Sequence, residues 1–149
     1  MKALLYWTCA SVVALSGFVG GQSAEKETLI GGWRLAWMED QGADGKVNRT
    51  TGPKGTLIYT RDGRMSVQLM FPNPETAPSN DYVQNGYEAS FGSYDVNEKT
   101  HTVTHHGEGS LTRGLVGKDL PRVFRFSGGR LIIRSPRPDE HWSVTWERY

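Results

Sequence analysis

The sequence predicts an all-β protein, an up-and-down antiparallel β-barrel of about eight strands. Short segments in which apolar and polar residues alternate recur from residue 33 to the end of the chain. Turn signals separate these segments, including Asp-Gly pairs at 44–45 and 62–63. No stretch has the pattern of a helix of three or more turns. A meander with this many strands removes its exposed edges by closing into a barrel, so we expect closure.

Alternation predicts the first strand over 33–40, and the Asp-Gly turn at 44–45 follows it. Asp-Gly favours a tight turn because glycine accepts a positive φ. The other strands predicted in this way cover residues 56–60, 65–69, 90–96, 102–110, 123–126, 130–134 and 142–149. The proline-containing segment 71–88 interrupts the series and has room for one short helix. It is either a lid over the barrel or a plain surface crossover.

The first 24 residues have the pattern of a secretory signal peptide. Lys2 precedes an apolar run over 3–19, and mainly small residues follow at 20–24. Cleavage would leave one domain over 25–149 without a cysteine, because Cys9 is the only cysteine of the chain. We therefore expect a secreted or periplasmic protein with no membrane contact after cleavage. The alternative is an uncleaved anchor, because the run is near the lower end of the roughly 17 to 25 residues that a span requires.

The charge balance excludes several classes of partner. The chain has 17 Lys and Arg against 16 Asp and Glu, a formal net charge of +1, and the basic residues are spread among the acids. Nucleic-acid binders carry a concentrated basic patch, so we expect no nucleic-acid partner. The sequence also has no Gly-rich phosphate loop and no Ser-His-Asp spacing, and it predicts no cofactor.

The clustered histidines His101, His105 and His106 do not predict a metal site. Adjacent strand residues face opposite sides of a sheet, and four residues along a strand cover roughly 13 Å. Three side chains placed in this way cannot meet at one tetrahedral zinc ion. We therefore expect no metal ligands here.

Large apolar residues alternate in the first predicted strand. Trp33, Leu35 and Trp37 lie at every second position, so we expect them to share the interior face. In the last strand Arg148 is in phase with Trp146. If the first and last strands pair, Arg148 lies over the Trp33 ring in a cation–π contact of about 0.5 to 2 kcal/mol.

Four sequence blocks carry a family resemblance. Gly31, Gly32 and Trp33 match the Gly-x-Trp of lipocalins, and a late arginine across that Trp is the lipocalin arrangement. The ordered blocks GGWRL, GTLIYTRDGRMSVQLM, FGSYDVNEKTHTVTHHGEGSL and WERY resemble the lipocalin-like domain family of small bacterial and fungal barrels, over residues 29–149. The resemblance implies a lipocalin-like barrel with structural roles for Gly31, Trp33 and Arg148. The chain departs from true lipocalins because Thr-Asp-Tyr is not at its usual place.

Inward-pointing polar residues are the candidates for a binding site, because small barrels are filled by side chains or hold one small ligand. His105 shares a face with Val103, and Arg122 shares one with Phe124, unless a bulge near Gly107 shifts the phase. His titrates near neutral pH and Arg stays charged, so this pair would suit a carboxylate or enolate and proton transfer. The alternative is that both are hydrogen-bonded core residues. The other predicted ligand-binding residues are Tyr59, Tyr94, Trp37 and Phe124.

Three hypotheses about function follow. The first is a secreted or periplasmic lipocalin-like protein that binds one small apolar or amphipathic molecule without catalysis. The second, which the family resemblance permits, is an isomerase, cyclase or dehydratase acting on a carbonyl-containing natural product in the same cavity. The third is a non-catalytic structural or interaction module with a filled barrel.

Overall fold

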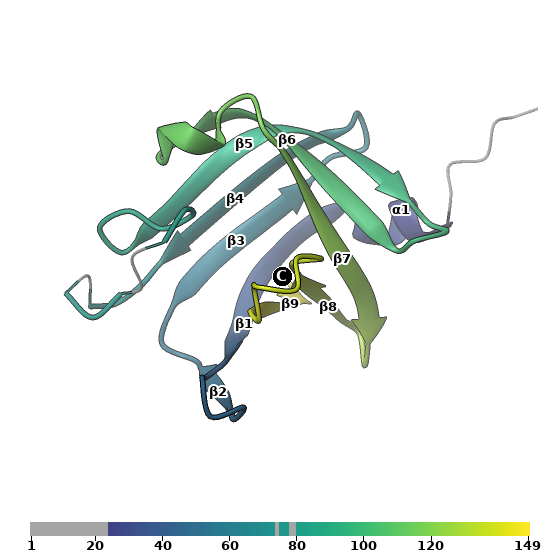
Figure 1. The fold of residues 1–149 in the computed structure, drawn as a ribbon. Helices are drawn as coiled ribbons and strands as arrows, with labels where there is room; N and C mark the ends of the chain where they lie inside the picture. Colours follow the sequence, from purple (N-terminus) through teal and green to yellow (C-terminus); the bar gives the residue numbers. More distant parts are fainter. Residues whose placement is uncertain (1–23, 74, 78–79) are drawn as a thin grey trace, which may run out of the picture.

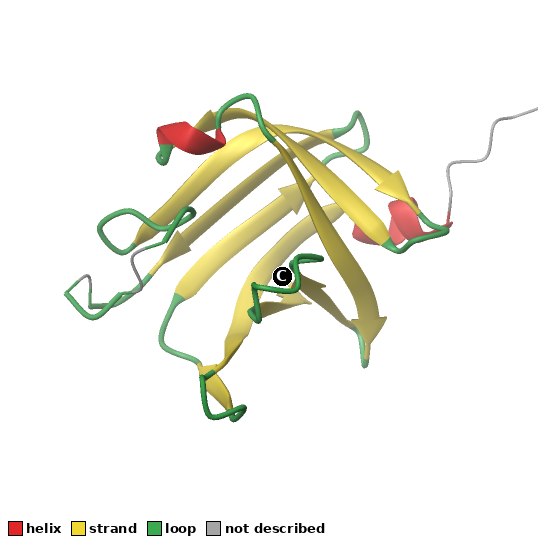
Figure 2. Ribbon diagram, viewed as in Figure 1, coloured by secondary structure: helices red, strands yellow, loops and turns green. Residues whose placement is uncertain are grey.

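The computed structural model describes residues 24–149 except 74 and 78–79. One antiparallel sheet of nine strands, in the order β2-β1-β3-β4-β5-β6-β7-β8-β9, closes through the pairing of β1 with β9 (Figures 1 and 2). Eight strands make the barrel and β2 is an additional short strand. The predicted all-β barrel is therefore confirmed. The segment predicted as a signal peptide lies outside the described residues except for Ala24.

The element bounds follow the predicted pattern, with differences at strand ends. The strands are β1 (Gly31–Gln41), β2 (Val47–Thr50), β3 (Lys54–Tyr59), β4 (Arg64–Met70), β5 (Tyr87–Asn97), β6 (Thr102–Ser110), β7 (Asp119–Ser127), β8 (Arg130–Arg134) and β9 (Ser143–Arg148). Two short helical segments are α1 (Ala24–Leu29) and the 3-10 turn η1 (Arg113–Leu115). Strand β2 was not predicted because all its residues are exposed, which removes the alternation.

The largest differences at strand starts are in β5 and β7, which begin three and four residues earlier than their alternation predicted. β5 starts at Tyr87, and β7 starts at Asp119 and includes the exposed Pro121. The predicted turn glycines Gly45 and Gly63 have φ values of 79° and 84°, as tight hairpins require. The 71–86 loop connects β4 to β5, and the sequence left room for one short helix there. Among the described residues of this loop, no helix forms.

Inward-facing residues of the strands form one core in which Trp33, Tyr59, Phe124 and Leu131 are almost completely buried. The barrel strands contribute residues at alternate positions to this core, as β-pleating requires, whereas β2 contributes none. Among the described residues, no helix is long and apolar enough to span a membrane.

Helix α1 covers one end of the barrel, and the described part of the 71–86 loop lies at the other end (Figure 1). The fully buried Leu29 anchors α1, and its carbonyl accepts a hydrogen bond from Trp33 Nε1 at 2.8 Å. Arg148 Nη1 donates to the carbonyl of Ile30 at 2.7 Å, and Nη2 donates to the carbonyl of Thr28. The expected contact between the end strands is present, with the Arg148 guanidinium 3.8 Å from the Trp33 ring centre. These bonds close this end of the barrel.

Gly31 occupies a position that other residues cannot take. Its φ of 127° lies in a region that L side chains rarely adopt, and a Cβ atom there would collide with the Arg148 side chain. The glycine therefore makes room for the arginine that bonds to the end of α1.

A β-bulge in β1 reverses the side-chain phase after Leu35. Leu35 pairs with Trp146, but the next paired residue is Trp37, which lies opposite Thr145. The extra residue, Ala36, moves Met38 into the interior position that alternation assigned to Trp37. The prediction that Trp37 faces the interior is therefore wrong.

Trp37 instead lies on the outer face between two cations. The guanidinium carbons of Arg49 and Arg130 are 4.5 and 5.0 Å from the centre of its ring. Arg49 also forms an ion pair with Glu39, with 2.6 Å between Nη2 and Oε1. Trp37 contributes to the outer surface and does not line the cavity described below.

Candidate ligand-binding cavity

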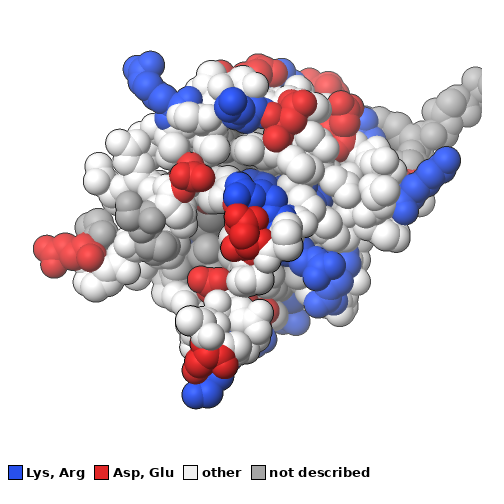
Figure 3. All heavy atoms as spheres, in the orientation of Figure 1, with Lys and Arg blue, Asp and Glu red and all other residues white. Residues whose placement is uncertain are grey.

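The barrel contains a cavity of about 280 Å³, whose lining includes residues of the loop at the end opposite α1 and no residue of α1 itself. Its walls are mainly apolar and include inward-facing residues of β3, β4, β8 and β9: Leu57, Val67, Leu69, Ile133 and Val144. In Figure 3 the surface is hollowed near its centre, with both acidic and basic side chains around the hollow. The volume is near the lower end of the range for ligand pockets, about 300 to 1,000 Å³, so the cavity suits a small molecule.

The 71–86 loop borders this cavity. Phe71, Asn80, Tyr82 and Val83 are among the lining residues, and Val83 is buried. The Asn80 side-chain oxygen accepts hydrogen bonds from the backbone N–H groups of Tyr82 and Val83, both at 2.9 Å. Local hydrogen bonding therefore fixes the part of the loop that carries Tyr82 over the cavity.

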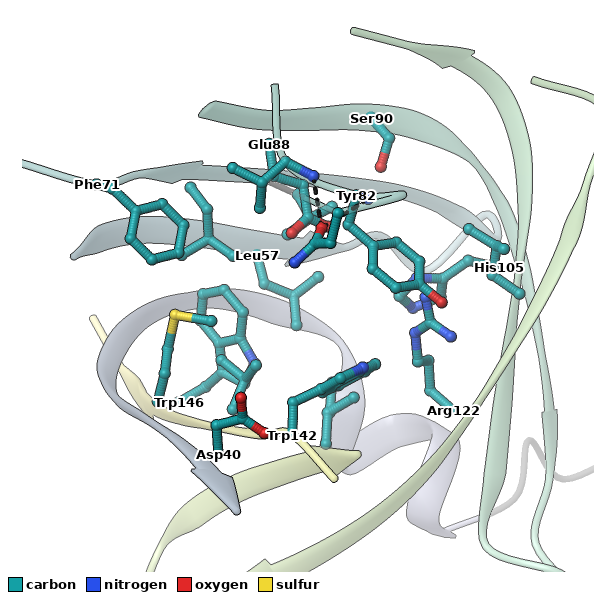
Figure 4. A pocket seen from close by; sticks show the side chains of 18 of the residues that line it. Asp40, Leu57, Phe71, Tyr82, Glu88, Ser90, His105, Arg122, Trp142 and Trp146 are labelled. Atoms are coloured by element: carbon teal, nitrogen blue, oxygen red, sulfur yellow. Dashed lines mark hydrogen bonds between the residues drawn. The ribbon is translucent and has the colours of Figure 1, made fainter. Parts of the chain in front are cut away.

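Arg122 of β7 is the cation of the cavity, and it is only 8% exposed. Its guanidinium carbon lies 4.9 Å from the centre of the Tyr82 ring and 5.0 Å from that of Trp142. Glu140 accepts hydrogen bonds from both rings, from the Tyr82 hydroxyl at 3.2 Å and from Trp142 Nε1 at 3.1 Å. Nη1 of Arg122 donates to the Pro121 carbonyl at 3.1 Å. The cation is thus held against an edge-to-face pair of aromatic rings, whose centres are 6.1 Å apart (Figure 4).

His105 of β6 also lines the cavity, and its Nε2 lies 2.6 Å from the buried hydroxyl of Tyr59. Burial, helped by the positive charge of Arg122, lowers the pKa of His105 to about 3. Burial also raises the pKa of Tyr59, so at neutral pH the phenol keeps its proton and the imidazole is neutral. The expectation that His105 titrates near neutral pH is therefore wrong, because the charged form would lose its hydration.

Glu88 is the acidic residue of the cavity that sequence reasoning missed. The predicted strand began at residue 90, whereas β5 begins at Tyr87 and carries Glu88 on its inner face with Ser90. Burial raises the pKa of Glu88 to about 7, and the charge of Arg122 opposes this rise. The sequence did contain a signal for this position: Glu88 and Tyr94 are an even number of residues apart, so on one continuous strand both side chains face the interior.

Two further predicted residues lie in the core below the cavity. Tyr94 packs on Tyr59, with 4.8 Å between ring centres, and its hydroxyl donates to the carbonyl of Thr60 at 2.9 Å. Phe124 packs edge-on against Phe126 at 5.9 Å. Neither Tyr94 nor Phe124 lines the cavity.

Of the six predicted ligand-binding residues, the structure therefore places only His105 and Arg122 on the cavity wall. Tyr59 reaches the site indirectly, through its hydrogen bond to His105. The bulge at Gly107 and Gly109 follows His105 along the strand, so it does not disturb the phase that points His105 inward.

The three clustered histidines diverge in space. On the outer face, His106 bonds to Asp119 at 2.6 Å and Asp95 at 3.0 Å, and these bonds raise the pKa of His106. His101 pairs with Glu25 of α1 at 2.9 Å, and the third histidine points into the barrel. Within the described ranges, no group of three or more His, Cys, Asp or Glu is arranged to hold a metal ion.

The closed barrel, the Trp33–Arg148 contact and the internal cavity define a lipocalin-like barrel. A family model described as a lipocalin-like domain matches residues 30–149, and the chain belongs to this family. No curated protein matches the chain.

Several solved structures are similar to the chain, including the following three. One is a lipocalin-like protein from Bacteroides uniformis ATCC 8492, which is 13% identical with a TM-score of 0.49 over 82% of this chain and 99% of that one. A protein from Bacteroides eggerthii DSM 20697 is 12% identical with a TM-score of 0.47, over 81% and 99% of the two chains. The wild-type fluorescent protein UnaG is 13% identical with a TM-score of 0.42, over 83% and 98%.

Proposed function

We propose that this protein binds one small amphipathic molecule inside the barrel. The observation that carries the proposal is a cavity of about 280 Å³ with mainly apolar walls and one buried cation, Arg122. Sites for small molecules commonly combine apolar walls with a few polar groups that fix the orientation of the ligand. An apolar body would pack against Leu57, Ile133 and Val144, and a polar end would face Arg122.

The proposal includes a location outside the cytoplasm. The support is the sequence pattern of residues 1–24, a basic start, an apolar run and small residues before Glu25. A secreted or periplasmic binding protein would meet its ligand after export. The test of this location is given in the Discussion.

Catalysis on a carbonyl-containing compound is a second candidate, and Glu88 is the observation that favours it. A carboxyl group with a pKa of about 7 is suited to proton transfer at neutral pH, and Arg122 would stabilise an enolate. An isomerase, cyclase or dehydratase would turn over the bound molecule and lose this activity in Glu88→Gln. These three reactions need no other reactant than the bound molecule. If prolonged incubation of the protein with its ligand returned the ligand chemically unchanged, catalysis would be contradicted.

Native mass spectrometry of the purified protein tests binding, and we expect one copurifying small molecule. Ser90→Phe places a ring in the cavity and should abolish copurification, because Ser90 lines the wall. Ser93→Phe is the matched control, since Ser93 lies on the same strand but outside the cavity lining. Thermal melts establish that both variants fold. Absence of a copurifying molecule, together with no binding of amphipathic probes by the wild type, would contradict the proposal.

A further inference from the structure

The cavity contains an indole donor without a partner. Trp146 of β9 lines the cavity and is 2% exposed, and among the described residues its Nε1 has no hydrogen-bond partner. Buried polar groups in native proteins are nearly always paired, because an unpaired donor loses its bond to water without replacement. An acceptor atom of a bound molecule would satisfy this N–H.

Arg122 presents unused hydrogen-bonding capacity to the same cavity. Of its guanidinium nitrogens, Nη1 donates to the Pro121 carbonyl. The Tyr82 and Trp142 rings both lie against the group, but only 6.1 Å separates the two ring centres, so the rings do not cover opposite faces of it. A guanidinium carries several in-plane donors and binds carboxylates with two of them at once. Donors of the group other than the one bonded to Pro121 are therefore available to an anion in the cavity.

Glu88 supplies the third unpaired group. Among the described residues, no donor bonds to its carboxyl, although the side chain lines the cavity. The charged or titratable groups that also line the cavity are Arg122 from β7, His105 from β6, Tyr82 from the loop, and Glu39 and Asp40 from β1. His105 is neutral at neutral pH, so Arg122 is the only cation among these lining groups.

The separation of the two donors limits the shape of the ligand. Arg122 is on β7 and Trp146 is on β9, and β8 lies between these strands. Strands are spaced about 4.8 Å apart, so the two backbones are about 10 Å apart. Figure 4 shows the two side chains on opposite sides of the cavity. One carboxylate cannot readily reach both donors, and a ligand that uses both carries two acceptor groups several bonds apart.

We propose that the ligand is a small carboxylic acid with a second acceptor oxygen. Its carboxylate contacts Arg122, its second oxygen accepts a hydrogen bond from Trp146 Nε1, and Glu88 takes up a proton when the acid binds. This inference rests on the proposed function, since it names the class of molecule that the cavity binds.

The proton uptake follows from charge balance. In the empty cavity, ionised Glu88 is a counter-charge for Arg122, and burial raises the pKa of Glu88 to about 7. A second anion beside Arg122 repels the Glu88 carboxylate and raises its pKa further. Binding then favours protonated Glu88, so affinity is full below about pH 7 and falls by up to about tenfold per pH unit above it.

Calorimetry with decanoate, decan-1-ol and 9-oxodecanoate between about pH 6 and pH 9 tests the anion and the proton. Both acids are ionised throughout this range and the alcohol is never ionised. We expect decanoate to bind at least about tenfold more tightly than decan-1-ol at pH 6 and to lose affinity above pH 7, while the alcohol shows no pH dependence. The Glu88→Gln variant should bind decanoate with the same affinity at about pH 6 and about pH 9. Glu108→Gln, on the outer face against Arg64, should keep the wild-type pH dependence.

A pair of tryptophan variants tests the second acceptor. We expect 9-oxodecanoate to bind about fivefold or more tightly than decanoate, and Trp146→Phe to remove this preference because Phe keeps the ring but lacks the donor. Trp37→Phe is the matched control, since Trp37 also has an Nε1 without a partner among the described residues but does not line the cavity. Equal binding of all three probes without pH dependence would overturn the inference and leave the proposed function standing. Failure of all three to bind would overturn both.

Discussion

The guanidinium of Arg148 lies 3.8 Å from the centre of the Trp33 ring and joins the last strand of the barrel to the first. The same arginine donates to the carbonyls of Thr28 and Ile30, and Trp33 Nε1 donates to that of Leu29. This one pair of residues therefore links the two closing strands to α1.

Trp33→Ala should lower the free energy of unfolding by about 3 to 5 kcal/mol, the usual cost of removing a large buried aromatic side chain. Arg148→Ala should cost less, because part of its guanidinium is solvated. The double variant should lose less than the sum, since either single change already removes the cation–π contact. Denaturant unfolding of the four proteins measures this coupling, and strictly additive losses would contradict it.

Arg122→Met should leave the fold largely intact and weaken binding of the copurifying molecule, because methionine retains packing against Tyr82 and Trp142 but has no charge. The loss should be largest for an acidic ligand. Arg125→Met is the control, since Arg125 is exposed on the same strand. Ligand titration and thermal melts compare the two variants. Equal binding by both, with unchanged melting temperatures, would show that Arg122 does not orient the ligand.

His105 should make the protein less stable in acid. The pKa of His105 is about 3 in the folded protein against an ordinary value of 6.5 for histidine, so unfolding takes up a proton between these values. Stability should therefore fall as the pH falls from about 6.5 toward 3. Urea unfolding at pH 7 and pH 5 should show a smaller acid loss in His105→Gln than in the wild type. Equal losses would indicate that His105 is solvated and titrates normally.

Export should produce a mature chain that begins between Gln22 and Glu25, since mainly small residues precede Glu25. N-terminal sequencing of protein recovered outside the cytoplasm measures this start. A chain that retains Met1 and fractionates with membranes would contradict cleavage and support the anchor alternative.

Local alternation was enough to predict the eight barrel strands, and their number predicted closure, which in turn predicted the contact between Trp33 and Arg148. Side-chain phase along a strand has a period of two, so the inward positions of His105 and Arg122 follow from neighbours in the sequence. The Asp-Gly turns are similarly local, because they need only a residue that accepts a positive φ. These features depend on a few consecutive residues, which the sequence displays directly.

The tertiary structure decided the features that depend on distant strands. The bulge between Leu35 and Trp37 arises in the pairing of β1 with β9, and it turned Trp37 to the outer face. The inward position of Glu88 required the true start of β5, and the low pKa of His105 required the surrounding barrel to exclude water. Whether the barrel encloses a cavity or a filled core also depends on the combined volumes of side chains from many strands. Pairing register, desolvation and packing volume are sums over the whole barrel, so no local pattern specifies them.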